Sequence, residues 1–160
     1  MVLAEELENG AFLRQFTPAH QRKLAGLARL KEHQADDVIF AERDHCPEVY
    51  LVLDGEVGLE IRVPGCGVIE VHRIGPGGLL GWSPVLGGGP MTATAVSTTR
   101  CRLAALPADQ ITALAERDPR FGLEFFRCMS AALAERLRAT RQQVPESARD
   151  KFRALREAAD

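Results

Sequence analysis

A glycine-rich segment is the part of the chain best suited by composition to hold a ligand. It covers residues 75–90, reads GPGGLLGWSPVLGGGP, and contains seven of the 14 glycines in the sequence. Glycine adopts backbone conformations closed to other residues and allows another molecule to approach the main chain closely. The segment is therefore either an elaborate turn or a loop shaped around a ligand, and composition alone leaves both alternatives open.

Side chains that could hold a metal or perform catalysis are scattered along the chain. No two histidines are spaced H-x-H and no two cysteines C-x-x-C, whereas metal sites and iron–sulfur clusters use closely spaced ligands. No Ser-His-Asp arrangement and no pair of carboxylates stands out either. We therefore expect no metal, no cofactor and no enzymatic activity. The residues considered are His20, His33, His45, His72, Cys46, Cys66, Cys101 and Cys128.

Composition and charge favour a single domain in the cytoplasm. Of the 160 residues, 46% are hydrophobic and 26% are charged, as in an ordinary globular protein. The net charge of −2 gives no general attraction to nucleic acid. No apolar run approaches the roughly 20 residues of a membrane-spanning helix, and the N-terminus is acidic where a secretory signal would be positive. We expect a protein that binds neither nucleic acid nor a membrane.

The central part of the chain predicts short β-strands. Residues 2 to about 30 have the pattern of short helices, with Thr17 as an N-cap and Pro18 at a first helical position. Short runs of β-branched, aromatic and alternating apolar residues follow, which are typical of strands. Six or more strands at such close spacing favour a sandwich or barrel over a parallel α/β sheet. The runs cover residues 38–40, 49–53, 57–63, 68–74, 92–98 and 101–106.

Two helices are predicted to close the domain. One opens at Pro107 and runs to about Glu116, and the next has Asp118 as its N-cap and runs to about Gln143. Within the second helix an apolar stripe approximates a heptad seam. We expect its first turns to pack on the strands and the part beyond Leu133 to meet a second copy, forming a homodimer. The stripe consists of Phe126, Leu133, Leu137, Thr140 and Val144.

The order of these elements resembles the cyclic-nucleotide-binding domain of the catabolite-activator and fumarate–nitrate-regulator transcription factors. The resemblance spans about residues 10–144 and is best in VYLVLDGEVGLEI, LLGWSPVL, MTATAV and ALAERLRATRQQV. It implies a mainly β fold, a jelly-roll (double-stranded β-helix) β-barrel with N-terminal helices and a long C-terminal helix. It also implies a division into a sensor domain at 1–144 and a short charged helical tail at 145–160.

In that family the loop corresponding to residues 81–93 is a phosphate-binding cassette. The resemblance assigns the cassette glycine to Gly81, the hydroxyl residue to Thr92 and the alanine to Ala93, while Trp82 stands where a glutamate belongs and Met91 where an arginine belongs. Ser83, which lies in the same loop, is also a candidate site residue. Thr140 aligns with a closing-helix threonine that contacts the adenine in the catabolite activator.

The two substituted anchors weaken the expected affinity for the family's usual ligand. Hydrogen bonds to charged groups contribute about 1.5–3 kcal/mol each, so two missing anchors would cost roughly 3–6 kcal/mol. Two readings of the loop stay open. Trp82 and Met91 either fill a vestigial pocket as core, or they line a pocket retuned to a less charged ligand, with Trp82 as a stacking surface.

We therefore predict a stand-alone regulatory sensor domain that binds cyclic AMP and cyclic GMP weakly or not at all. It would act as a homodimer through a protein partner, with a small-molecule ligand as a further option. Residues 145–160 are too few for the three helices of a DNA-binding module, so direct DNA binding is not expected. The alternative is a cupin-like metalloenzyme on the same jelly-roll fold, in which His45 and His72 would meet in space.

Overall fold

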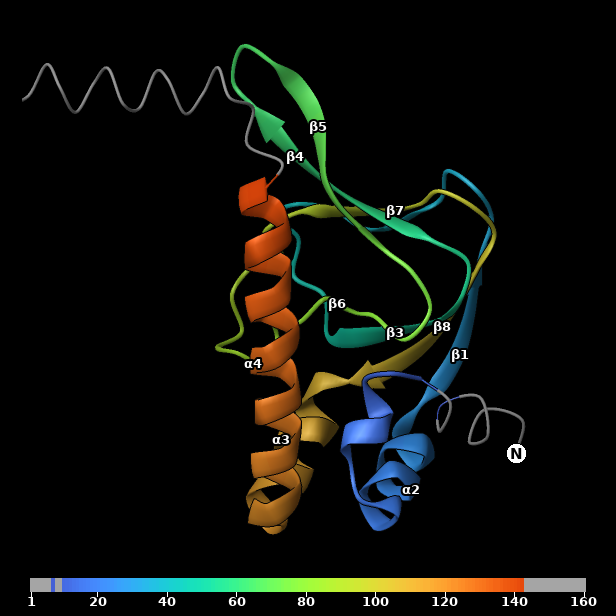
Figure 1. Cartoon of the computed structure of the whole chain (residues 1–160), viewed down its shortest axis with the longest axis vertical. Coiled ribbons are helices and arrows are strands. Elements are labelled where there is room, and N and C mark those ends of the chain that lie inside the picture. The colour runs from blue at the N-terminus through green and yellow to red at the C-terminus, as the bar shows by residue number, and fades with distance from the viewer. Residues whose placement is uncertain (1–6, 8–9, 143–160) are drawn as a thin grey trace, which may run out of the picture.

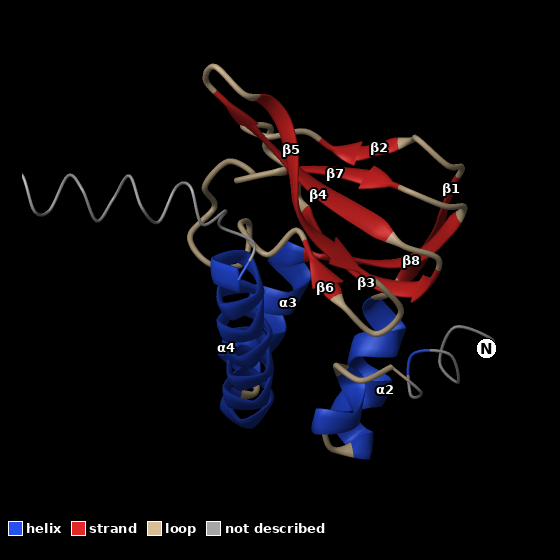
Figure 2. Cartoon of the chain, turned by 45° about the horizontal axis from the view of Figure 1, so that its top comes forward, coloured by secondary structure: helices blue, strands red, loops and turns tan. Residues whose placement is uncertain are grey.

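Eight strands form an antiparallel β-sandwich with flanking helices (Figures 1 and 2). The computed structural model describes residue 7 and residues 10–142. One sheet has the order β1-β8-β3-β6 and the other β2-β7-β4-β5. The strands are β1 (Arg29–His33), β2 (Val38–Phe40), β3 (Glu48–Asp54), β4 (Val57–Val63), β5 (Gly67–Ile74), β6 (Leu79–Leu80), β7 (Thr94–Ser97) and β8 (Cys101–Pro107).

Strands β3 and β8 are buried on both faces and separate two hydrophobic clusters. Successive side chains of a strand point to opposite faces. On β3, Val49 and Leu51 accordingly join a cluster shared with the helices, which we call the helix-side core. Tyr50 and Val52 join a second cluster with residues of the other sheet, which we call the inter-sheet core. This double burial explains why β3 has a continuous apolar sequence rather than an alternating one.

The helices gather against the outer face of the first sheet. They are the 3₁₀-helix η1 (Leu13–Gln15), α2 (Pro18–Leu27), α3 (Ala108–Arg117) and α4 (Pro119–Gln142). Figure 1 shows α4 as a long rod that continues past α3 and alongside the sandwich. Phe12, Phe16, Phe121 and Phe125 pack their rings together, with centroids 5.4 to 6.3 Å apart in the contacting pairs. No helix in the described ranges is long and apolar enough to cross a membrane.

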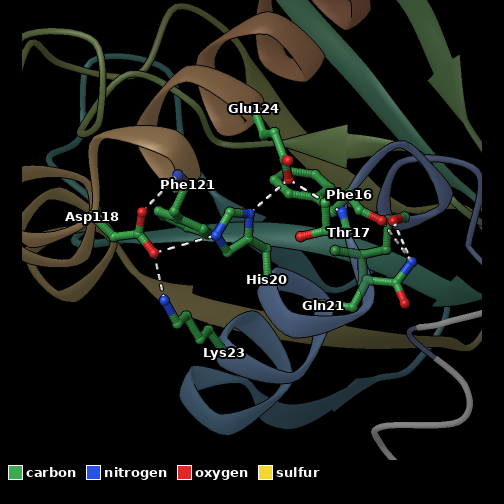
Figure 3. A network of polar contacts seen from close by, with 9 residues as sticks. Phe16, Thr17, His20, Gln21, Lys23, Asp118, Phe121 and Glu124 are labelled. Carbon is green, nitrogen blue, oxygen red and sulfur yellow. Dashed lines mark hydrogen bonds and ion pairs between the residues drawn. The ribbon is translucent and has the colours of Figure 1, made fainter.

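A network of polar contacts around His20 joins α2 to the start of α4 (Figure 3). His20 is 8% exposed, and its Nε2 lies 3.2 Å from Oδ2 of Asp118. Asp118 also accepts a hydrogen bond from the backbone N–H of Phe121 at 3.2 Å, which is the predicted N-cap contact of α4. A hydrogen bond from Lys23, followed by the Phe121 N–H, lowers the pKa of Asp118 to about 2.

The predicted jelly-roll architecture and the six predicted strands are confirmed, but the N-terminal assignment is wrong at its end. The helical pattern was expected to continue to about residue 30, whereas α2 ends at Leu27 and Leu30 lies in β1. β1 pairs with β8, with Arg29 opposite Ala105 and His33 opposite Cys101. Because Leu30 is 44% exposed on this strand, the hydrogen bonds to β8, and not burial of an apolar side chain, decide its conformation.

The residues of the predicted dimer seam have different environments on α4. Leu133 packs against the helix-side core, whereas Leu137 is 61% exposed. The hydroxyl of Thr140 donates to the carbonyl of Arg136 at 2.9 Å. Val144 and the predicted tail at 145–160 lie outside the described residues.

Candidate ligand-binding site

The candidate loop begins with a backbone conformation that requires glycine. Gly81 has φ +75°, and a Cβ there would lie 3.2 Å from the carbonyl oxygen of Glu48 and 3.3 Å from the Tyr50 ring. Other residues rarely adopt this conformation, and the neighbours are backbone and a buried ring that cannot move aside freely. Gly81 therefore sets the direction in which the loop leaves β6.

The loop then folds into a tight turn that uses its own amides. The N–H of Val85 donates to the carbonyl of Trp82 at 3.1 Å, and the N–H of Gly88 donates to the carbonyl of Ser83 at 3.2 Å. Backbone N–H groups are the donors that a phosphate cradle presents to an anion. The N–H groups of Val85 and Gly88 already donate to carbonyls within the turn, so these two groups are not available to an anion.

Six of the seven predicted site residues line one cavity, which is very small. Its volume is about 20 Å³, close to the space needed for one water molecule. Small-molecule sites usually measure about 300–1,000 Å³. The loop residues in its lining are Gly81, Trp82, Ser83, Met91, Thr92 and Ala93, and the remaining lining residues are Phe40, Leu59 and Arg136.

Met91 and Trp82 each pack into a hydrophobic core. Met91 is 3% exposed and belongs to the inter-sheet core. Its backbone is fixed on both sides, because its N–H donates to the carbonyl of Asp44 and its carbonyl accepts from Arg43, both at 2.8 Å. Trp82 is partly buried and packs against the helix-side core. The two positions that hold charged residues in the family pattern are thus occupied here by side chains that contribute to packing.

Thr140, the seventh predicted site residue, does not line this cavity. One turn earlier on α4, Arg136 does, and it is the only charged residue in the lining. Its Nη2 donates to the carbonyl of Leu79, and burial lowers its pKa to about 10. Sequence reasoning missed Arg136 because it is one of many arginines on α4, and only the packing of the helix distinguishes it.

The other candidate residues lie apart from the site. Cys101 and Cys128 are buried, as expected of small apolar side chains, and the four cysteines are free thiols. His45 is exposed on the loop between β2 and β3, and His72 is partly buried on β5. In the part of the chain that the structure describes, no three His, Cys, Asp or Glu side chains are grouped so that they could hold a metal ion.

Comparison with known proteins identifies the fold. Residues 30–118 match the family model described as the cyclic nucleotide-binding domain. None of the curated proteins matches the chain. A cyclic nucleotide-binding domain from Methylobacillus flagellatus KT superposes with a TM-score of 0.78 at 21% identity, covering 89% of this chain and 80% of its own.

Two further solved structures have the same architecture. A putative cyclic nucleotide-binding protein from Geobacter metallireducens GS-15 has a TM-score of 0.74 at 22% identity, covering 86% of this chain and 99% of its own. The catabolite activator protein of Thermus thermophilus has a TM-score of 0.67 at 26% identity, covering 87% of this chain and 61% of its own.

Proposed function

Since the chain belongs to the cyclic nucleotide-binding domain family, we propose that it is a regulatory module whose cassette binds cyclic AMP and cyclic GMP weakly or not at all. The observation that carries this proposal is the cavity of about 20 Å³, which has no room for a nucleotide. Opening it would require Met91 to leave the inter-sheet core, and the protein would lose the apolar contacts of a nearly fully buried side chain.

The module would act through protein contacts and not by catalysis. Regulatory proteins are among the structures that it resembles, including the Thermus thermophilus catabolite activator protein. We propose that α4 forms a homodimer, because Leu123, Phe126 and Leu137 are exposed on it at 54%, 36% and 61%. These residues share the three-and-four spacing of a helix–helix seam with Leu133. The protein partner and a cytoplasmic location stay predictions.

A thermal-shift measurement tests the cassette proposal. Cyclic AMP or cyclic GMP at about 100 µM would stabilise a protein with a micromolar dissociation constant by about 2.7 kcal/mol, raising the melting temperature by roughly 5–10 °C. We expect a shift below about 1 °C with either nucleotide, which corresponds to a fraction of 1 kcal/mol. A shift of several degrees would show that Thr92 and the loop backbone suffice to bind the phosphate.

The cupin-like alternative gains no support from the described residues, because His45 and His72 belong to no grouping that could hold a metal. Metal analysis of the purified protein separates the two proposals. A stoichiometric transition metal would favour the metalloenzyme.

A further inference from the structure

The guanidinium of Arg136 is largely buried and has no carboxylate partner among the described residues. Nη2 donates to the carbonyl of Leu79, and Nε is buried without a hydrogen-bond partner. Taking a charge out of water costs free energy, and buried charges are therefore usually paired with an opposite charge. An unpaired guanidinium at this position leaves a place for an anion.

Arg136 also lines a second cavity. Its volume is about 360 Å³, within the range of small-molecule sites. It is bounded by α4, β5, the turn before β6 and the segment before α2, and its apolar wall includes Phe12, Ile74 and Leu79. Arg136 is the one residue that lines both this cavity and the small cassette cavity. We call the larger space the α4–β5 cavity.

The charges around the α4–β5 cavity suit a ligand with a single negative charge. Besides Arg136, its ionisable lining residues are His72 on β5 and Glu135 on α4. Burial and the charge of Arg136 lower the pKa of His72, with Glu135 opposing, so His72 is neutral at pH 7 and can hydrogen-bond without adding charge. Glu135 is exposed, so water and salt weaken its repulsion of an anion on Arg136 without abolishing it.

We propose that the α4–β5 cavity binds a small organic monocarboxylate, with the carboxylate on Arg136 and an apolar body against Phe12 and Ile74. A guanidinium and a carboxylate match in shape and form charge-assisted hydrogen bonds. Apolar atoms of the ligand would be removed from water where they contact these two side chains, which favours binding. Apart from Arg136, this site shares no lining residue with the cassette cavity, so the proposal goes beyond the proposed function.

Calorimetric titration with phenylacetate and its neutral isostere phenylacetamide tests the proposal on the unmodified protein. We expect phenylacetate to bind at least about tenfold more tightly than the amide, because only the carboxylate engages the charge of Arg136. Equal affinities, or no phenylacetate binding up to about 10 mM, would overturn the proposal. Tighter binding of inorganic phosphate than of phenylacetate would overturn the ligand class.

Three variants of α4 locate the site. Arg136→Gln should weaken phenylacetate binding at least about tenfold and leave phenylacetamide binding unchanged. Arg138→Gln removes the same charge from an exposed position two residues away and should leave both affinities unchanged. Glu135→Gln should strengthen phenylacetate binding a few-fold, because it removes a negative charge from the lining. If Arg136→Gln fails to fold, the Glu135→Gln variant tests the proposal alone. Phenylacetate binding to that variant that is unchanged or weaker contradicts the proposal.

Discussion

Nδ1 of His20 lies 2.7 Å from Oε2 of Glu124, which joins α2 to the second turn of α4 across 104 positions of the sequence. The same carboxylate oxygen accepts the backbone N–H of Thr17 at 3.2 Å (Figure 3). Burial alone would raise the pKa of Glu124, but the hydrogen bonds from His20 and Thr17 outweigh it and lower the pKa. With Nε2 of His20 on Asp118, both ring nitrogens face carboxylates.

The substitution His20→Gln should lower the free energy of unfolding by about 1.5–3 kcal/mol, because it removes charge-assisted hydrogen bonds from two carboxylates. Urea unfolding followed by circular dichroism measures the change. His45→Gln, at an exposed position, serves as the control and should stay within about 0.5 kcal/mol of the unmodified protein. Equal effects of the two substitutions would mean that the His20 contacts contribute nothing specific.

Asp118 should make the protein sensitive to acid. The pKa of its carboxyl is about 2 in the folded state, below the ordinary value of 3.8, so the unfolded state binds the proton more tightly. Stability from this group is therefore present above about pH 4 and is lost as the pH falls towards 2. Asp118→Asn should be less stable than the unmodified protein near neutral pH and should lose less stability below about pH 4.

The measurement is the urea midpoint recorded at several pH values across this window. Asp54→Asn, at an exposed end of β3, is the matched control and should keep the acid dependence of the unmodified protein. An Asp118→Asn variant with an unchanged slope below pH 4 would show that the contact with Lys23 does not persist in solution.

Restoring both charged anchors should give the cassette measurable affinity for cyclic AMP. The variant Trp82→Glu with Met91→Arg supplies the acceptor and the cation of the family pattern beside Gly81, Thr92 and Ala93. We expect a gain of at least about tenfold over the unmodified protein by calorimetry, since each charged hydrogen bond contributes about 1.5–3 kcal/mol. Trp82→Glu alone lacks the cation and should gain less.

The same variant also reports on packing. Because Met91 is in the inter-sheet core and Trp82 packs against the helix-side core, losing either could cost about 3–5 kcal/mol. Near-ultraviolet circular dichroism establishes whether the variant is folded. A folded double variant that ignores cyclic AMP would mean that the internally bonded turn of Trp82, Ser83 and Gly88 no longer presents a phosphate cradle.

An exposed leucine on α4 should control assembly. Leu137→Glu places a charge on the proposed helix–helix seam and should convert a dimer into a monomer, measured by light scattering at about 50 µM. Arg138→Glu adds negative charge at the adjacent exposed position and should leave the dimer intact. Leu133 is a poor choice for this test because it packs on its own helix-side core. A monomeric unmodified protein would contradict the proposal.

Local sequence patterns determined most of the elements. Pro18 and Pro119 suit the first turn of a helix, where a missing N–H costs nothing, and both begin helices in the structure. The alternation in Val57–Val63 likewise predicts a strand, and β4 covers these residues, although burial is continuous over its first three residues and does not alternate. These signals lie in neighbouring residues, so the chain order of the jelly-roll could be predicted before any tertiary contact was known.

Only the tertiary structure decided the conformation of β1, the size of the cassette cavity and the environment of Arg136. Each of these depends on contacts between residues that are distant in the sequence. The segment Arg29–His33 is a strand because β8 supplies its hydrogen bonds, although Leu30 continues a helical spacing. The resemblance to the family predicted the residues of the cassette, but only the packing around Met91 shows that the cavity they line measures about 20 Å³. Arg136 resembles the other arginines of α4 in sequence. It differs from them because the position of the helix against Leu79 buries its guanidinium, and burial is a property of the folded chain.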